Sequence, residues 1–296
     1  MTSRRGLTLV ELMITLVMLA IVGASLGRIL VRTFRVSDAQ LSQADMQSNV
    51  RTGGLILPLE LREIGYDSNI TTGVVTSDLE AMAANEIQFR AARGFSTTCG
   101  TPTLNEFRFR KPVTGVRLPR ITDGFLLYVE NDENIGIDDQ WIPLTVTAIN
   151  LNGLCGADSA VVLTVTTPQV APGVNLAMSN IFVGGPIRYY ERMRFGAFVD
   201  ADGLTYLGAR SVSAGEATYQ AVAGPVSPAN GIQFRYFARN GNSLDPGSAD
   251  PADARSVQVT VRGLTRNAIN LSGAANRARA GMTTTTLVAL RNTLKH

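Results

Sequence analysis

The chain has 296 residues, and its 27 Lys and Arg side chains exceed its 24 Asp and Glu side chains by only three. Such a small net charge does not favour binding to nucleic acid or to an acidic surface. The sequence contains only one histidine, His296, and two cysteines, which is too few for a zinc site of the usual Cys/His kind. Before residue 296 there is no histidine that could act as the base in Ser-His-Asp or Cys-His catalysis. Phosphate-binding glycine loops are also missing from the sequence. We therefore expect no cofactor and no enzymatic activity.

An apolar segment begins close to the amino terminus, directly after Arg4 and Arg5. Between residues 7 and 27 the only ionisable side chain is Glu11, and most of the others are Leu, Ile, Val, Met or small residues. About 20 apolar residues are enough for a helix to cross the roughly 30 Å hydrocarbon core of a bilayer. We therefore predict a membrane-spanning helix over residues 7–27.

A cleaved secretory signal is the main alternative for this segment, with a cut near the small residues at 24–27. Glu11 argues against it, because a carboxylate in the apolar core costs on the order of 2.5 to 3.5 kcal/mol at mid-membrane and is rarely kept without a function. The helical pattern also continues well beyond residue 27. We therefore favour a retained helix.

The residues at the start of this helix resemble a known signal. Gly6 is followed by Leu7-Thr8-Leu9-Val10 and then, five residues after the glycine, by Glu11. This pattern is similar to the class III signal of type IV prepilins and of the pseudopilins of type II secretion. The resemblance implies cleavage after Gly6 by a prepilin peptidase, which also methylates Leu7. It further implies that Glu11 pairs with a terminal amine during assembly, since opposite charges attract strongly in a layer of low dielectric constant.

Cleavage would remove residues 1–6 as a leader, and the loss of Arg4 and Arg5 would leave 25 basic against 24 acidic side chains. Charge does not settle the orientation of the span, because Arg28, Arg32 and Arg35 follow it. The resemblance implies a cytoplasmic amino terminus, a single-pass anchor in the inner membrane and a globular part in the periplasm. After assembly the chain would lie in a pilus.

Beyond the span, apolar residues recur three, four or seven positions apart, at Val36, Ala39, Met46, Val50, Leu57, Leu61 and Ile64. This spacing is typical of an amphipathic helix, so we predict one N-terminal helix over residues 7–64. Gly53-Gly54 and Pro58 are the predicted bend sites, and Gly65 is the predicted end. The Gly23 and Gly27 pair has the spacing that lets two helices approach closely, although glycine is also common in membrane helices.

From residue 65 to residue 296 the pattern changes to the alternation of apolar and polar residues that is typical of half-buried strands. Strands are predicted over 86–90, 106–110, 125–129, 144–149, 161–166, 187–192, 232–237, 257–261 and 284–290, the last of which would also suit a short helix. Turn signals of the Asp-Gly or Asn-Gly kind lie at 123–124, 152–153, 202–203, 230–231 and 240–241, and a surface loop is predicted over 244–254. The predicted fold is therefore α+β, with a long N-terminal helix packed on an antiparallel β-sheet domain.

An extracytoplasmic location favours a disulfide between Cys99 and Cys155, provided that their Cα atoms lie within about 7 Å. Two separately buried thiols are the alternative. Oxygen ligands alternate over 132–138 and over 200–203, as in calcium loops, but neither segment has the closing glutamate of an EF-hand. The neighbouring carboxylates at 138 and 139 are better explained by a solvated turn than by acid/base chemistry. We therefore expect no metal site.

Arginines alternate along residues 107–110 and recur at 188, 192, 194, 235 and 239. A basic strand face of this kind can contact nucleic-acid phosphates, but solvated strand faces have the same pattern. We do not expect a nucleic-acid partner.

Several later segments, at 61–66, 187–190, 231–236, 257–261 and 286–292, are similar to those of the PilW-like minor pilins. The J-type pseudopilins of type II secretion systems share much of this pattern. The resemblance implies a minor pilin that initiates or caps a type IV pilus and contacts other pilins through its N-terminal helix. A J-type pseudopilin is the first alternative, and an anchored extracytoplasmic β-rich binding protein is the second.

Overall fold

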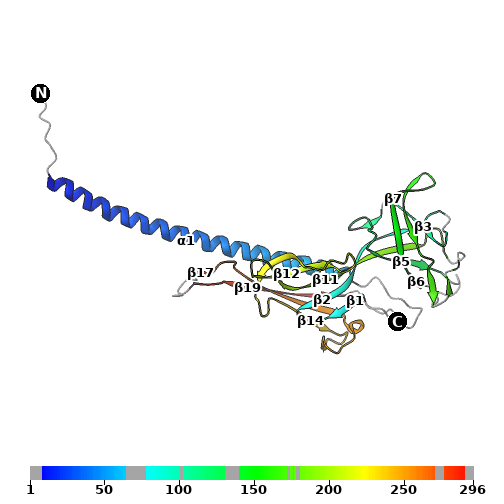
Figure 1. Cartoon of the computed structure of the whole chain (residues 1–296). Helices are drawn as coiled ribbons and strands as arrows, with labels where there is room; N and C mark the ends of the chain where they lie inside the picture. Colours follow the sequence, from blue (N-terminus) through cyan, green and yellow to red (C-terminus); the bar gives the residue numbers. More distant parts are fainter. Residues whose placement is uncertain are drawn as a thin grey trace, which may run out of the picture.

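One long helix and a β-rich part make up the computed structural model of the chain (Figure 1). The structure describes residues 9–64, 78–100, 103–111, 113–130, 140–171, 174–175, 177, 181–270 and 277–290. The helix, α1 (Leu9–Arg62), has 54 residues. At 1.5 Å per residue it is roughly 80 Å long. The predicted α+β fold, a long helix followed by an antiparallel sheet domain, is confirmed.

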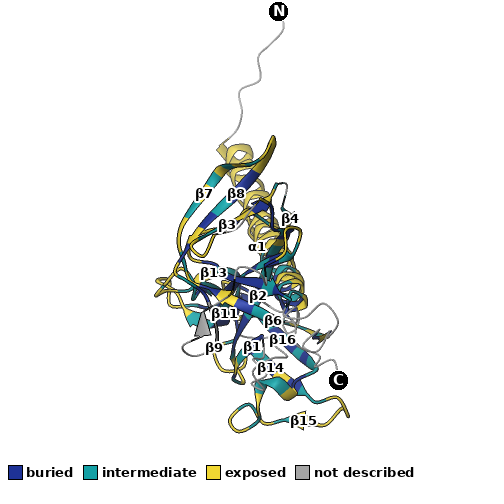
Figure 2. Cartoon of the chain, turned by 90° about the vertical axis from the view of Figure 1, so that its right-hand side faces the viewer, coloured by how far each residue is buried: buried dark blue, intermediate teal, exposed yellow. Residues whose placement is uncertain are grey.

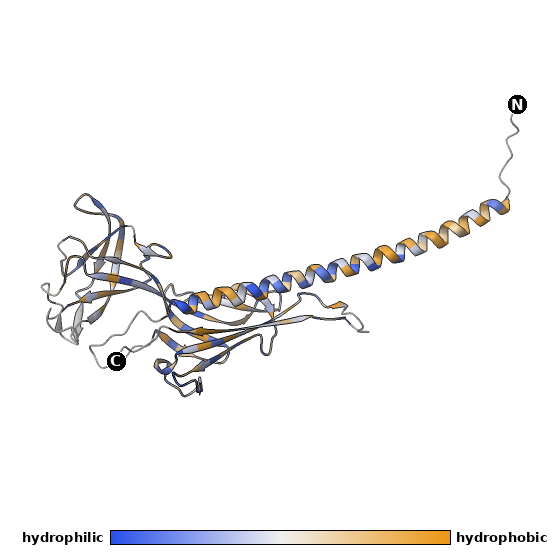
Figure 3. Ribbon diagram, turned by 180° about the vertical axis from the view of Figure 1, so that it is seen from behind, coloured by the Kyte–Doolittle hydropathy of each residue, from blue (hydrophilic) through white to orange (hydrophobic). Residues whose placement is uncertain are grey.

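The two halves of α1 have different surroundings. Every residue from 9 to 38 is exposed, and this half is mostly apolar (Figures 2 and 3). The second half packs on the sheet and buries Met46, Val50, Gly53, Leu57, Pro58 and Leu61. The predicted inner face is therefore confirmed from residue 46 onward. Val36, which shares the same periodicity, is half exposed because the sheet does not cover that part of the helix.

The predicted bend sites do not interrupt α1, which is helical from Leu9 to Arg62. The two glycines allow a close approach to the sheet instead. A Cβ atom on Gly53 would lie 3.1 Å from Cβ of Ala223, and one on Gly54 would lie 2.9 Å from Cγ2 of Thr284. Residue 65, the predicted end signal, lies outside the described residues.

A large antiparallel sheet packs against the second half of α1. Its main strand order is β1 (Leu79–Met82), β2 (Glu86–Thr97), β11 (Pro186–Val199), β12 (Thr205–Ser211), β13 (Gln220–Val226), β16 (Ser256–Leu264), β14 (Ile232–Phe237) and β15 (Ser243–Leu244). Four more strands join this order from the side. Here β19 (Gly281–Ala289) pairs with β16, β4 (Thr114–Gly115) pairs with β2, and β5 (Gly124–Val129) pairs with both β11 and β6 (Gln140–Leu144).

A second, three-stranded sheet lies at the end of the molecule farthest from the start of α1 (Figure 1). Its order is β3 (Glu106–Arg110), β8 (Asp158–Val165) and β7 (Val146–Cys155). The remaining described elements are the short pairs β9 (Gln169–Ala171) with β10 (Val174–Asn175) and β17 (Ile269–Asn270) with β18 (Arg277–Ala278), and a 3-10 turn, η2 (Pro251–Asp253).

A disulfide joins the two sheets. Cys99, which follows β2, is bonded to Cys155, the last residue of β7, and their Cα atoms are 6.0 Å apart. The bond therefore ties the three-stranded sheet covalently to the sheet that carries α1.

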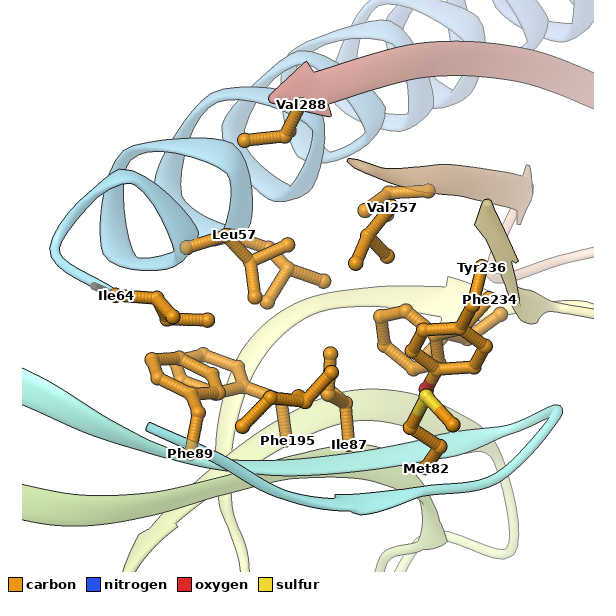
Figure 4. Packing of buried hydrophobic residues seen from close by; sticks show 14 of the residues in the cluster. Leu57, Ile64, Met82, Ile87, Phe89, Phe195, Phe234, Tyr236, Val257 and Val288 are labelled. Carbon is orange, nitrogen blue, oxygen red and sulfur yellow. The ribbon is translucent and has the colours of Figure 1, made fainter. Parts of the chain in front are cut away.

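Two apolar cores follow from this arrangement. The first lies between α1 and the main sheet, where Leu57 and Ile64 of the helix end face Phe89 and Phe195 of two paired strands (Figure 4). The rings of Phe89 and Phe195 are stacked with their centroids 5.9 Å apart. The second core lies farther from the start of α1 and is built mainly from β3, β5, β6, β8 and the first part of β11, with side chains that include Phe107, Phe125 and Leu163.

Each of the nine predicted strand segments is at least partly in a strand, with two differences in detail. The segment 144–149 belongs to two strands, because β6 ends at Leu144 and β7 begins at Val146. The turn predicted at Asn152-Gly153 is wrong, because both residues lie inside β7, where the pairing with β8 shifts register between Asn150 and Gly153. The segment 284–290, which also suited a helix, forms most of β19.

Candidate assembly helix

The first half of α1 presents an apolar surface that the described part of the chain does not cover. Its large apolar side chains between residues 9 and 31 are 50–76 % exposed. None of the most apolar window of the helix is buried, and that window is long and apolar enough to cross a membrane. Exposed apolar surface costs about 25 cal/mol per Å² in water, so this half of the helix requires lipid or other apolar helices around it.

Glu11 lies in the first turn of α1, where the helix dipole favours a negative charge. It is the only acidic residue of that turn. Gly6 and Leu7, the predicted cleavage and methylation sites, lie outside the described residues, so both roles stay predictions. Farther along, apart from the adjoining backbone of α1 itself and the neighbouring residues in the chain, no described atom lies within 4 Å of the Cβ positions of Gly23 and Gly27, and this face of the helix is therefore open.

The other end of α1 is fixed to the sheet by a network of buried and half-buried charges. Arg93 of β2, which is 6 % exposed, donates through Nη1 to Oε2 of Glu60 on the helix at 2.8 Å. Through Nε the same guanidinium donates to Oε2 of Glu191 on β11 at 2.9 Å. One arginine therefore joins the last turns of the helix to two paired strands.

The network continues from Glu191 toward the loop that precedes β5. Arg117 donates to Glu191 at 3.2 Å and forms two bonds of 2.6 Å with Asp123. Ser211 of β12 donates to the other carboxylate oxygen of Glu191 at 2.7 Å. The hydrogen bonds from Arg117 to Asp123 raise the pKa of Arg117. The Tyr189 hydroxyl donates to the Arg117 carbonyl, and burial raises the pKa of Tyr189 to about 12.

The charge of Glu191 should make the fold sensitive to acid. Burial by itself would raise the pKa of Glu191, but hydrogen bonds from Ser211 and Arg93, together with the charge of Arg93, lower it overall. A carboxyl group with a lowered pKa in the folded state stabilises the fold above its unfolded pKa of about 4.3, and this contribution disappears as the pH falls through the folded value.

We therefore expect Glu191→Gln to lower the melting temperature of the full chain in detergent near neutral pH. The deficit relative to the wild type should shrink as the pH falls below about 4, because the wild-type carboxylate is then protonated as well. Thermal unfolding followed by circular dichroism at a series of pH values measures this. A deficit of the same size at every pH would show that the charge of Glu191 is not what stabilises the fold.

The calcium pattern at 200–203 is a turn whose carboxylate already has partners. Asp202 accepts from the Tyr206 hydroxyl at 2.6 Å and from the Leu204 backbone N–H at 2.9 Å, and it pairs with Arg266 at 3.0 Å. Residues 132–139, which carry the other calcium pattern and the adjacent carboxylates, lie outside the described residues. Within the described ranges, no group of three or more His, Cys, Asp or Glu side chains is placed to hold a metal ion.

Most of the arginines that formed the predicted basic face are paired with carboxylates. Arg108 pairs with Glu106, Arg110 with Asp158, Arg192 with Glu80 and Arg194 with Glu86, at distances from 2.7 to 3.3 Å. These contacts offset the positive charge of the strand faces, which weakens the case for a phosphate-binding surface.

A cavity of about 400 Å³ lies beside β2, β4 and β11. Two of its charged lining residues, Arg90 and Arg93, form ion pairs with carboxylates, and its described lining contains no Ser, Cys or His. Its lining therefore offers no nucleophile of the serine or cysteine kind and no histidine base.

Comparison with known protein families gives a match at the amino terminus. Residues 1–27 match a family model described as the prokaryotic N-terminal methylation motif. No curated protein and no solved structure matches the chain. The motif and the apolar helix behind it support a protein of the type IV pilin or pseudopilin kind, which is a structural subunit anchored by its N-terminal helix.

Proposed function

We propose that this chain is a minor pilin, a structural subunit that initiates or caps a type IV pilus. The observation that carries the proposal is the apolar half of α1, which is exposed over its whole length and begins within the methylation motif. A helix with this surface needs lipid around it before assembly and other apolar helices around it afterwards. Incorporation into a bundle of pilin helices meets the second requirement without new chemistry.

The remaining features fit a domain that is displayed outside the cytoplasm. The bond between Cys99 and Cys155 is of the kind that persists in the periplasm and at cell surfaces. The network around Arg93 fixes the helix end to the domain, so force on the helix reaches the β-rich part directly. In this proposal the span lies in the inner membrane, the domain lies in the periplasm, and both enter the pilus on assembly.

Mass spectrometry of the mature amino terminus tests the processing step. We expect the chain purified from its host to begin at Leu7 and to carry one methyl group on the amine. A start near residue 27, as after a secretory signal, or at Met1 would overturn the proposal. A J-type pseudopilin would also begin at methylated Leu7, and a tagged chain separates the two, because only a pilus subunit is recovered in filaments sheared from the cell surface.

Glu11→Ala should leave membrane insertion intact and reduce incorporation into sheared filaments by at least about tenfold. The reduction is expected because a terminal amine left unpaired in an apolar layer costs several kcal/mol. Immunoblots of membranes and of sheared filaments measure the two steps. Thr15→Ala is the matched control, since the Thr15 hydroxyl bonds only to carbonyl groups of its own helix. Equal incorporation of the Glu11 and Thr15 variants would rule out the pairing role.

A further inference from the structure

The exposed part of α1 carries two sets of charges on neighbouring faces. Arg28, Arg32 and Arg35 are spaced four and three residues apart, so they form one basic stripe. Asp38 and Asp45 are seven residues apart and form an acidic stripe on an adjacent face. All five side chains are exposed, and none of them forms an ion pair or a side-chain hydrogen bond with another described residue.

The two stripes match each other in register. Arg28 and Arg35 are seven residues apart, as are Asp38 and Asp45, and each aspartate lies ten residues after its arginine. Ten helical residues correspond to a rise of about 15 Å. Two parallel copies of α1 that are displaced by about 15 Å therefore bring Arg28 opposite Asp38 and Arg35 opposite Asp45 at the same time.

We propose that the basic stripe of α1 docks on the acidic stripe of a second copy of this chain, displaced along the helix axis by about 15 Å. This inference rests on the proposed function and adds that at least two copies are adjacent in the assembly. The chain would then form a short run of subunits rather than act as a single cap.

The geometry makes the contact open-ended. Ten residues at 3.6 per turn rotate the acidic stripe by roughly 80° from the basic one, so each copy uses one face for the copy above and another for the copy below. A contact between two different faces does not close on itself, and its repetition produces a filament rather than a symmetric dimer. The stripe arrangement therefore suits a helical assembly.

The acidic stripe also borders a groove that suits arginine side chains. Asp38, Leu41 and Asp45 line one wall of a groove of about 560 Å³ between α1 and the sheet, and Tyr206 and Pro225 line the other. Arginine stems can pack on such mixed surfaces while their guanidinium groups reach the carboxylates. Arg266, which also borders the groove, already pairs with Asp202 at 3.0 Å.

The displacement distinguishes this contact from contacts within the membrane. It equals about half of the roughly 30 Å hydrocarbon core, so two copies whose spans lie at the same depth in the bilayer cannot be in this register. The pairing therefore belongs to the assembled state. Lipid phosphate groups are the other occupant that the basic stripe would attract, and the experiments below separate the two.

Cysteine cross-linking between two differently tagged full-length chains tests the register. We expect disulfides in sheared filaments for Arg28→Cys with Asp38→Cys and for Arg35→Cys with Asp45→Cys. Arg28→Cys with Asp45→Cys is the control that should not cross-link, because in this register the two positions are seven residues, or about 10 Å, apart along the helix axis, which is too far for a disulfide. The native cysteines do not interfere, because they are bonded to each other. Cross-links only between identical positions would overturn the proposal.

Charge reversal tests the energetics. Arg28→Asp with Arg35→Asp should reduce incorporation into filaments by about fivefold, as expected for the loss of two exposed ion pairs. Adding Asp38→Arg and Asp45→Arg to the same chain should restore incorporation, because every interface is then complementary again. If the arginines instead bind lipid phosphate, the variant with all four substitutions will not recover its incorporation into filaments. If the wild-type chain is recovered in filaments but the cysteine variants do not cross-link as expected, the stripe contact alone is overturned. If the wild-type chain is missing from filaments, the proposed function is overturned as well.

Discussion

Replacing Arg93 with methionine is expected to lower the free energy of unfolding of the β-rich part by about 3–5 kcal/mol. Methionine keeps the apolar stem of the side chain but leaves Glu191, which is 9 % exposed, without its closest cation. It also breaks the link from Glu60 of the helix to β2. Removing one partner from a buried network is costly because the remaining charge stays desolvated. Urea unfolding of the full chain in detergent, followed by the fluorescence of Trp141, the only tryptophan, measures the loss.

Arg192→Met is the matched control for this experiment. Arg192 also pairs with a carboxylate, Glu80, at 2.8 Å, but its side chain is 44 % exposed. Exposed pairs contribute about 0–1 kcal/mol, so the control should lose much less stability. If both variants lose the same amount, the network around Arg93 has no special role in fixing the helix to the sheet.

The helix and many of the strands could be predicted because their residue periodicity is a local property of the sequence. The spacing of Met46, Val50, Leu57 and Leu61 repeats at the helical period, and the alternation in residues 106–110 matches a strand with one buried face. Other strands gave no such signal. In β12 and β13 the residues include several Gly and Ala and one Pro, and these carry little of the alternation on which the prediction depends.

Among the site residues too, those that form a local pattern could be predicted from the sequence and those that are distant in the sequence could not. The motif around Glu11 is contiguous, and it was found from the sequence. The network around Arg93 was not, because its ion-pair partners are 33 residues away at Glu60 and 98 residues away at Glu191. Charged residues are usually exposed, so nothing local marks Arg93 and Glu191 for burial or Glu60 as their neighbour. Only the pairing of β2 with β11, and the packing of α1 on both, brings them together.

Leu57→Ala is the second change for which we expect a large effect. Leu57 is fully buried on the inner face of α1, in the core that contains Phe89 and Phe195 (Figure 4). Truncating a buried leucine removes apolar contact and leaves a cavity, which typically costs about 2–5 kcal/mol. The substitution weakens the packing between α1 and the main sheet. Amide hydrogen exchange should therefore become faster in the last turns of α1, with a smaller change in the three-stranded sheet.

Leu59→Ala provides the control, because it removes the same atoms two residues farther along the same helix. Leu59 is 56 % exposed. An exposed substitution of this kind usually changes stability by less than about 0.5 kcal/mol. Since the two variants have the same composition and the same helix propensity, the difference between their unfolding free energies reports the burial of Leu57 alone. Equal unfolding free energies for the two variants would contradict the packing of α1 on the sheet through this face.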